Sequence, residues 1–168
     1  MMPSRPIRIV VILMALICTA VCDHVTKHFA RTELERIGPI ILPGHFIELI
    51  LAENPGAFLS LGASFPPAVR SVLTACVSIG LAFLLVYLVS TPRLQWVFFL
   101  GLALVWSGGV SNLIDRIIRH GLVTDFVMLR FGPLHTGIFN LADLAITVGM
   151  LLALIAPLHA RPPKNEIR

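Results

Sequence analysis

Two long stretches without a single charged residue constrain what this chain can fold into more than any other feature of its sequence. They cover residues 71–92 and 94–114. At about 20 residues, each is long enough to cross the roughly 30 Å of hydrocarbon in a bilayer as a helix. Two shorter apolar runs, 9–22 and 144–157, reach that length only by including polar neighbours. We therefore predict four transmembrane helices, at about residues 7–27, 70–90, 94–114 and 137–157.

The composition agrees with a membrane protein. Of the 168 residues, 57% are hydrophobic and 13% are charged, whereas soluble domains carry about 25% charged residues. We expect one integral membrane domain over residues 1–168. The formal net charge of +4 comes from basic residues spread along the chain, without the basic stripe of a nucleic-acid-binding protein. We therefore expect contact with membrane phospholipids and not with nucleic acid.

The first apolar run has two interpretations. Arg5 and Arg8 precede it, as basic residues precede the core of a cleaved signal peptide. Val21 stands where such a cleavage would need a small residue, which favours a helix retained in the membrane.

The number of spans decides which residues share a side of the membrane. With four spans, the C-terminal ends of the first and third helices and the N-terminal end of the fourth face one compartment. The two loops that carry most other polar residues lie there as well. Short basic segments lie at the opposite ends, so the positive-inside tendency places both termini in the cytoplasm and the polar face outside it.

Both loops on the polar side contain strand-forming sequences. Residues 45–51 follow Pro43-Gly44, and residues 121–131 precede Gly132-Pro133. Apolar and β-branched residues bounded by turn formers are typical of strands. We predict that the two segments pair into a small sheet lying on the membrane.

Two aspartates lie where an apolar chain should disfavour them. Asp143 begins the last apolar run, and a carboxylate at the centre of a membrane helix costs about 2.5–3.5 kcal/mol, which makes it a functional candidate. Asp125 follows a predicted strand, where an aspartate is commonly just solvated. It gains a role only if its loop folds back toward Asp143.

If the two carboxylates meet, they titrate as a coupled pair. One ionised and one protonated carboxyl can activate a water and protonate a leaving amine, as in aspartic proteases. This chemistry requires neither a metal nor a cofactor, and we expect none. The sequence has no HExxH motif, and its six histidines lack metal-ligand spacing.

Polar residues near the ends of the first and last spans each have a structural alternative. Asp23 and Lys27 share a helical face at a spacing of four. They form either an ion pair from which Lys27 reaches the head groups, or a support for the site. Asn140 can cap the last helix, and the helix dipole favours Asp143 in the first turn.

The third span ends in a dense polar segment. Gly108 and Gly109 allow a neighbouring helix to approach closely. Asn112, Asp115 and Arg116 share a face at spacings of three and four. They form either a polar clamp between helices or a layer supporting the aspartates, in which Arg116 can fork onto a carboxylate.

At these residues the chain resembles the signal peptidase II family, which are aspartyl proteases of the bacterial inner membrane. Five motifs carry the resemblance in order over nearly the whole chain. They are Asp23-x-x-Thr26-Lys27, Asn54-Pro55-Gly56-Ala57-Phe58, Gly108-Gly109-x-x-Asn112-x-x-Asp115-Arg116, Val123-x-Asp125-Phe126 and Phe139-Asn140-x-Ala142-Asp143. The second motif departs from the family, because only Ala57 precedes Phe58 where two small residues are usual. Either Phe58 or Leu59 fills the place of the aromatic residue.

The resemblance implies a fold, a reaction and a site. The fold has four transmembrane helices, a periplasmic β-cradle and a short surface helix, in an inner-membrane protein expected to be a monomer. The reaction removes the signal peptide from prolipoproteins, just before a cysteine that carries diacylglyceryl, and globomycin-like cyclic peptides are possible inhibitors. Asp125 and Asp143 are the implied catalytic pair. The implied supporting or substrate-binding residues are Asp23, Lys27, Asn54, Gly56, Asn112, Arg116, Asn140 and Ala142.

Two other classes of function compete with a peptidase. A small transporter would use Asp143 as a proton site deep in the bundle, but Asp143 lies near one end of its predicted span. A relative that binds lipidated peptides without cleaving them would not need the intact aspartate pair.

Overall fold

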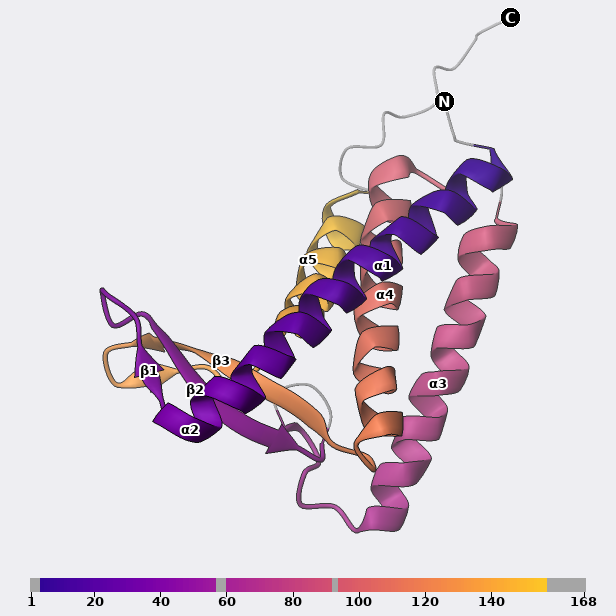
Figure 1. Ribbon diagram of the computed structural model, residues 1–168. Coiled ribbons are helices and arrows are strands. Elements are labelled where there is room, and N and C mark those ends of the chain that lie inside the picture. The colour runs from indigo at the N-terminus through magenta and orange to yellow at the C-terminus, as the bar shows by residue number, and fades with distance from the viewer. Residues whose placement is uncertain (1–3, 57–59, 92–93, 157–168) are drawn as a thin grey trace, which may run out of the picture.

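The computed structural model describes residues 4–56, 60–91 and 94–156, which form a helical bundle with a sheet projecting from one end (Figure 1). The first helix, α1, continues into a π-helical turn, η1, and a short α2. The described helices are α1 (Arg5–Phe29), η1 (Ala30–Leu34), α2 (Glu35–Ile37), α3 (Pro67–Ser90), α4 (Trp96–Ile118) and α5 (Leu141–Ile155); the strands are β1 (Ile40–Ile41), β2 (Ile47–Asn54), β3 (Val123–Phe131) and β4 (Leu134–His135).

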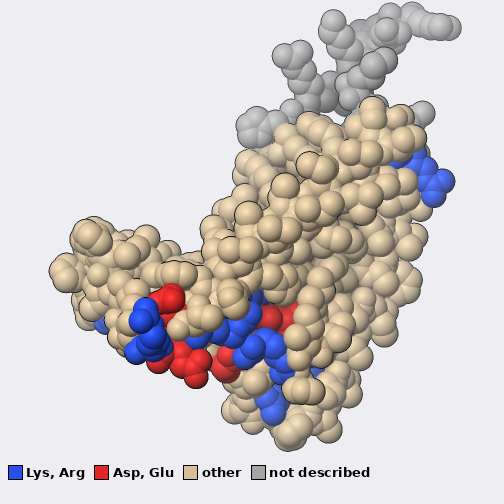
Figure 2. All heavy atoms as spheres, in the orientation of Figure 1, with Lys and Arg blue, Asp and Glu red and all other residues tan. Residues whose placement is uncertain are grey.

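Three described helical segments are long and apolar enough to cross a membrane: Arg5–Ile37, Pro67–Ser90 and Trp96–Ile118. Helix α5 is apolar but has 15 residues. Large apolar side chains point outward, including Val25, Phe83 and Leu154 at 62%, 71% and 70% exposure. On the face seen in Figure 2, charged side chains gather where the sheet meets the bundle, a further basic group lies at the opposite end, and the flank between them is uncharged. An apolar exterior of this kind suits lipid, so the chain is a multi-pass membrane protein.

Helices α4 and α5 pack backbone against backbone through glycines. A Cβ at Gly101 would lie 2.6 Å from the carbonyl oxygen of Gly149, and one at Gly108 would lie 2.5 Å from that of Ala142. Gly109 instead faces Leu81 of α3. The predicted close approach at Gly108 and Gly109 is therefore confirmed. It presses the N-terminal end of α5, where Asp143 lies, against the polar face of α4.

The two loops form one small antiparallel sheet, as predicted, with the strand order β1-β2-β3-β4. Its central pair joins β2 to β3, with Ala52 opposite Asp125 and Asn54 opposite Val123 after a register shift between Leu49 and Ala52. Strand β2 runs three residues beyond the predicted segment and so carries Asn54 to the base of the sheet, near Asp125. Phe139 also bridges Val127, which ties the chain before α5 to β3.

Arg8 joins two helices at the end of the bundle opposite the sheet. Its guanidinium donates to the carbonyl oxygens of Leu88 at 3.3 Å and Val89 at 3.1 Å, and also to that of Thr91. These carbonyls belong to the C-terminal end of α3, where helical carbonyls lack intrahelical partners. Arg8 is 6% exposed, so this basic residue caps α3 and is not a free surface charge.

The glycine contact between α4 and α5 predicts that alanine destabilises the protein at the contacting glycines but not at a glycine outside the contact. Gly101→Ala and Gly149→Ala each place a methyl group against the opposing backbone, and we expect a loss of roughly 1–3 kcal/mol of unfolding free energy. Thermal unfolding of the purified protein in detergent measures this loss. Gly80→Ala in α3 is the matched control, because no atom lies within 4 Å of its added Cβ. An unchanged unfolding temperature in Gly101→Ala would contradict the contact.

Candidate active site

Asp143 belongs to the capping box at the start of α5. The Oδ1 of Asn140 accepts the backbone N–H of Asp143 at 2.9 Å, and the Oδ2 of Asp143 accepts the backbone N–H of Asn140 at 3.3 Å. The predicted cap is therefore present, and Asp143 is part of it. The reciprocal bonds fix the carboxylate at the positive end of the helix dipole.

Asn140 links the two aspartates. Besides capping α5, its Nδ2 donates to the Oδ1 of Asp125 at 2.6 Å. The loop has therefore folded Asp125 back toward Asp143, which was the condition for a shared function. Asp125 is 1% exposed and Asp143 is 5% exposed, so both carboxyls are withdrawn from bulk water.

Asn54 holds the other oxygen of Asp125. Its Nδ2 donates to the Oδ2 of Asp125 at 2.8 Å, while its Oδ1 accepts the backbone N–H of Gly56 at 2.8 Å. A backbone N–H can only donate, so the Gly56 bond forces the amide nitrogen of Asn54 toward Asp125.

Burial dominates the electrostatics of Asp125. It raises the pKa of this carboxyl from 3.8 to about 7, and the charge of Asp143 acts in the same direction. The hydrogen bonds from Asn54 and Asn140 oppose the shift. A carboxyl that titrates near neutral pH is suited to proton transfer under physiological conditions.

Lys27 lies at the centre of a buried ionic cluster. Its Nζ lies 2.7 Å from Asp23 and 3.2 Å from Asp115, and its side chain is 0% exposed. The alternative in which Lys27 reaches the lipid head groups is therefore wrong. Nζ also donates to the Oδ1 of Asn112 at 3.0 Å. Because an ammonium group only donates, the Nδ2 of Asn112 must point the other way, where it donates to Asp143 at 2.9 Å.

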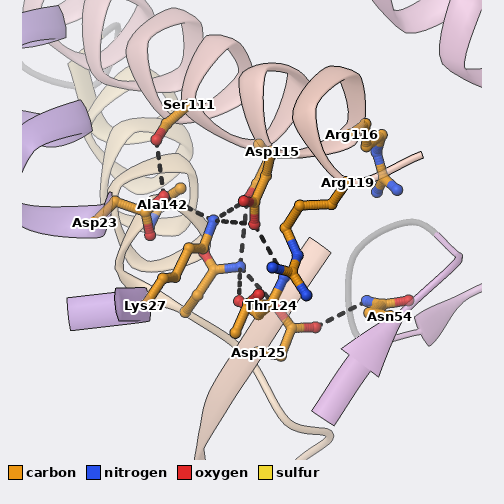
Figure 3. Close-up of polar contacts among 12 residues, drawn as sticks. Asp23, Lys27, Asn54, Ser111, Asp115, Arg116, Arg119, Thr124, Asp125 and Ala142 are labelled. Atoms are coloured by element: carbon orange, nitrogen blue, oxygen red, sulfur yellow. Dashed lines mark hydrogen bonds and ion pairs between the residues drawn. The ribbon is translucent and has the colours of Figure 1, made fainter. Parts of the chain in front are cut away.

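The two acidic partners of Lys27 each hold the backbone beside one aspartate of the pair (Figure 3). Asp23 accepts the backbone N–H of Ala142 at 3.0 Å, and Asp115 accepts that of Thr124 at 2.9 Å. Ala142 and Thr124 directly precede Asp143 and Asp125. Ser111 completes the cluster by donating its hydroxyl to Asp23 at 2.7 Å.

Arg116 contacts backbone and not a carboxylate. Its guanidinium donates to the carbonyl oxygens of Gly56 at 2.6 Å and Gly121 at 3.1 Å. The predicted fork onto a carboxylate is therefore wrong, and Arg116 joins the loop after β2 to the loop before β3. Gly56 has no room for a side chain there, because a Cβ would lie 2.7 Å from the carbonyl oxygen of Leu61.

Sequence reasoning gave no role to two buried residues of this site. Ser111 precedes Asp115 by four, a spacing that could have suggested a shared helix face. Thr124 acts through its backbone N–H, and its hydroxyl accepts from Arg31 at 2.9 Å, neither of which leaves a signal in the sequence. The choice between Phe58 and Leu59 falls outside the described residues.

Two buried carboxyls linked by one asparagine, at the end of a bundle of membrane-length helices, define a membrane-embedded aspartic peptidase as the class of protein. The model of the family described as signal peptidase (SPase) II matches residues 14–159. The chain therefore belongs to the signal peptidase II family, the aspartic peptidases that remove signal peptides from prolipoproteins, as its motifs predicted.

Individual relatives agree with this assignment. The chain is 34% identical over 142 residues to the lipoprotein signal peptidase of Hydrogenovibrio crunogenus, covering 84% of this chain and 81% of the relative. It is 37% identical over 131 residues to that of Desulforapulum autotrophicum, covering 77% and 80%. A solved structure of a bacterial membrane enzyme superposes with a TM-score of 0.77 at 23% identity, over 94% of this chain and 93% of that chain. That likeness shows a shared fold.

The ionic cluster predicts a large effect of removing its cation. Lys27→Met leaves Asp23 and Asp115 buried without a counter-charge, and we expect a loss of about 3–5 kcal/mol of unfolding free energy. Chemical or thermal unfolding in detergent measures it. Arg36→Met is the matched control, since Arg36 pairs with Glu33 at 2.6 Å but is 71% exposed, and exposed pairs contribute about 0–1 kcal/mol. Equal losses in the two variants would contradict the role of Lys27.

The raised pKa of Asp125 predicts a pH dependence of stability. In the folded protein Asp125 keeps its proton up to about pH 7, whereas an ordinary aspartate, with a pKa of 3.8, releases it at lower pH. The stability that this retained proton contributes is therefore fully present below pH 3.8 and is lost as the pH rises toward 7. A shift of about three units, at about 1.4 kcal/mol per unit, sets an upper limit of about 4 kcal/mol.

Unfolding measured from pH 4 to pH 8 tests this dependence. We expect Asp125→Asn to lose less stability than the wild type over this interval. The exposed Glu35 supplies the control variant Glu35→Gln, which should follow the wild type. Parallel curves for the wild type and Asp125→Asn would show that burial does not perturb Asp125.

Proposed function

We propose that Asp125 and Asp143 are the catalytic pair with which this chain removes signal peptides from diacylglyceryl-modified prolipoproteins, cutting before the lipid-bearing cysteine. The observation that carries the proposal is Asn140, which bonds Asp143 through the capping box and Asp125 through its amide. That both carboxyls bond to one residue supports their acting on the same water.

The chemistry follows from one proton shared by the pair. The ionised carboxyl takes a proton from a water, whose oxygen attacks the scissile carbonyl carbon. The protonated carboxyl donates to the carbonyl oxygen as the tetrahedral intermediate forms. The other carboxyl then passes the proton it took from water to the leaving amine as the peptide bond breaks, and the first carboxyl takes its proton back from the intermediate's hydroxyl as the carbonyl re-forms. A pKa of about 7 for Asp125 supports a half-protonated pair near neutral pH.

Asn54, Asn112 and Asn140 are positioning residues in this proposal. Each directs its amide N–H at a carboxyl oxygen, so the three hold the pair in a fixed orientation without carrying charge. Asp23 and Lys27 act one step further away, through Asn112 and the backbone of Ala142. Arg116 fixes Gly56, whose loop lies beside the pair.

A cavity beside Asp143 supports binding of the apolar part of a substrate next to the pair. It has a volume of about 260 Å³ between α3, α4 and α5. Leu73, Val77 and Ile146 line it on the apolar side, and Asn112 and Asp143 on the polar side. An extended peptide can present its scissile bond to the pair while apolar side chains stay among the helices, and a globomycin-like cyclic peptide would compete for the same space.

The orientation in the membrane is part of the proposal. Helix α5 serves as a fourth span, the sheet forms a cradle, and the site faces the periplasm of a bacterial inner membrane with both termini in the cytoplasm. In support, the sheet and the pair lie at one end of the bundle, and the first residues of α1 and the last of α5 lie at the other (Figure 1). One chain supplies both carboxyls and their partners, which supports an active monomer.

Cleavage of a diacylglyceryl prolipoprotein by purified variants tests the function. We expect Asp125→Asn and Asp143→Asn to lose cleavage by at least about a thousandfold while still binding the substrate, because each removes a group needed for proton transfer. Glu53→Gln is the control, a carboxylate on the same sheet that pairs with Arg119 at 2.6 Å outside the site.

Two results would contradict the proposal. Unimpaired cleavage by either aspartate variant would remove that residue from the catalytic pair. Uncut substrate accumulating on the folded wild-type protein would instead indicate a family member that binds lipidated peptides without cleaving them.

A further inference from the structure

A second and larger hollow lies between α3 and α4, outside the proposed catalytic site. It has a volume of about 780 Å³ and is bounded by the first three turns of α3, the C-terminal end of α4 and the loop that follows. It shares Arg70 and Arg116 with the cavity beside Asp143, but Asp143 and Asn112 do not line it. We refer to it as the α3–α4 groove. Its lining residues include Arg70, Ser71, Thr74, Arg116 and His120.

The titratable residues that line the α3–α4 groove are all basic. They are Arg70, Arg116 and His120, and no aspartate or glutamate is among its described lining residues. Arg116 is already bonded to two carbonyls. The side chain of Arg70, in contrast, forms no hydrogen bond or ion pair with any described residue, its Nε included. An arginine side chain that lines the groove and has no acceptor within the described chain can bind an anion there through charge-assisted hydrogen bonds.

The length of the groove along α3 and its apolar lining residues indicate that its occupant also has an apolar part. The lining follows α3 from Arg70 to Ser78, and these nine residues span about 12 Å along a helix. Ala75 of α3 and Leu113 and Ile117 of α4 give the wall apolar surface, beside the hydroxyl residues Ser71, Thr74 and Ser78. Basic residues at one end of the groove and a partly apolar wall beyond them match an amphiphile better than free phosphate or an acidic peptide.

We propose that the α3–α4 groove binds a phospholipid with an anionic headgroup, with its phosphate between Arg70 and His120 and an acyl chain between α3 and α4. Basic pockets between membrane helices are suited to lipid head groups. A zwitterionic headgroup would place its own cation among these basic side chains and is disfavoured. The bound lipid would lie next to the cavity proposed for the substrate, since Arg70 and Arg116 line both.

Lipid retention measures this binding directly. The full chain is reconstituted in bilayers of equal phosphatidylglycerol and phosphatidylcholine, released into detergent, and examined by native mass spectrometry for bound lipid. We expect the wild type to retain phosphatidylglycerol over phosphatidylcholine. Arg70→Gln should reduce that retention roughly tenfold or more, because it removes a charge-assisted contact, and His120→Gln should reduce it less.

Two variants separate the groove from general effects of charge and folding. Arg36→Gln removes an exposed basic residue at the same end of the bundle and should retain lipid as the wild type does. Arg70→Lys keeps the cation and should preserve the preference for phosphatidylglycerol, which distinguishes lost charge from a lost fold.

Three outcomes would overturn the proposal. Equal retention of phosphatidylglycerol by the wild type and Arg70→Gln would show that Arg70 does not bind it. Equal retention of both lipids by the wild type would remove the anionic preference. Displacement of the lipid by millimolar inorganic phosphate would assign the basic end of the groove to free phosphate.

Discussion

The ion triad of Lys27, Asp23 and Asp115 is the interaction on which the rest of the site depends. Three charges withdrawn from water are stable only when they are paired and hydrogen-bonded. Here Asp23 accepts the backbone N–H of Ala142 through the oxygen that Lys27 does not contact, and Asp115 accepts the backbone N–H of Thr124 through the same oxygen that pairs with Lys27. Each of these residues precedes one member of the aspartate pair. One lysine therefore fixes the backbone at both ends of the proposed catalytic centre, while also orienting Asn112.

Local patterns predicted the elements of this structure better than the contacts between them. Uncharged runs identified α3 and α4, and strand-forming residues bounded by turn formers identified β2 and β3, because both signals depend on neighbouring residues. The spacing of Asp23 and Lys27 placed them on one face. It could not show that this face turns inward, because that depends on α4 lying beside it. For the same reason the sequence suggested a carboxylate for Arg116, whose partners in the fold are carbonyls.

The aspartate pair combines two kinds of support. Asp143 is held by a helix N-terminus, whose dipole and capping box come from nearby residues. Asp125 is held by a strand, through a register that pairs residues more than 70 positions apart. The spacing of Asn140 and Asp143 predicts the helix cap that holds Asp143. The contact between Asn54 and Asp125 depends on the pairing of β2 with β3 and on the register shift in β2, which the sequence does not reveal. The glycine contacts along α4 then bring the two supports together.

The contact between Arg8 and α3 has a consequence for how the chain assembles. The acceptors of Arg8 lie 80 or more residues later in the sequence, so its guanidinium has no protein partners when α1 first enters the bilayer. It must stay at the aqueous boundary until α3 is made, and only then can it be withdrawn from water. The outermost described turn of α1 is thus anchored by a segment synthesised later, so this contact can form only after α3 has been translated.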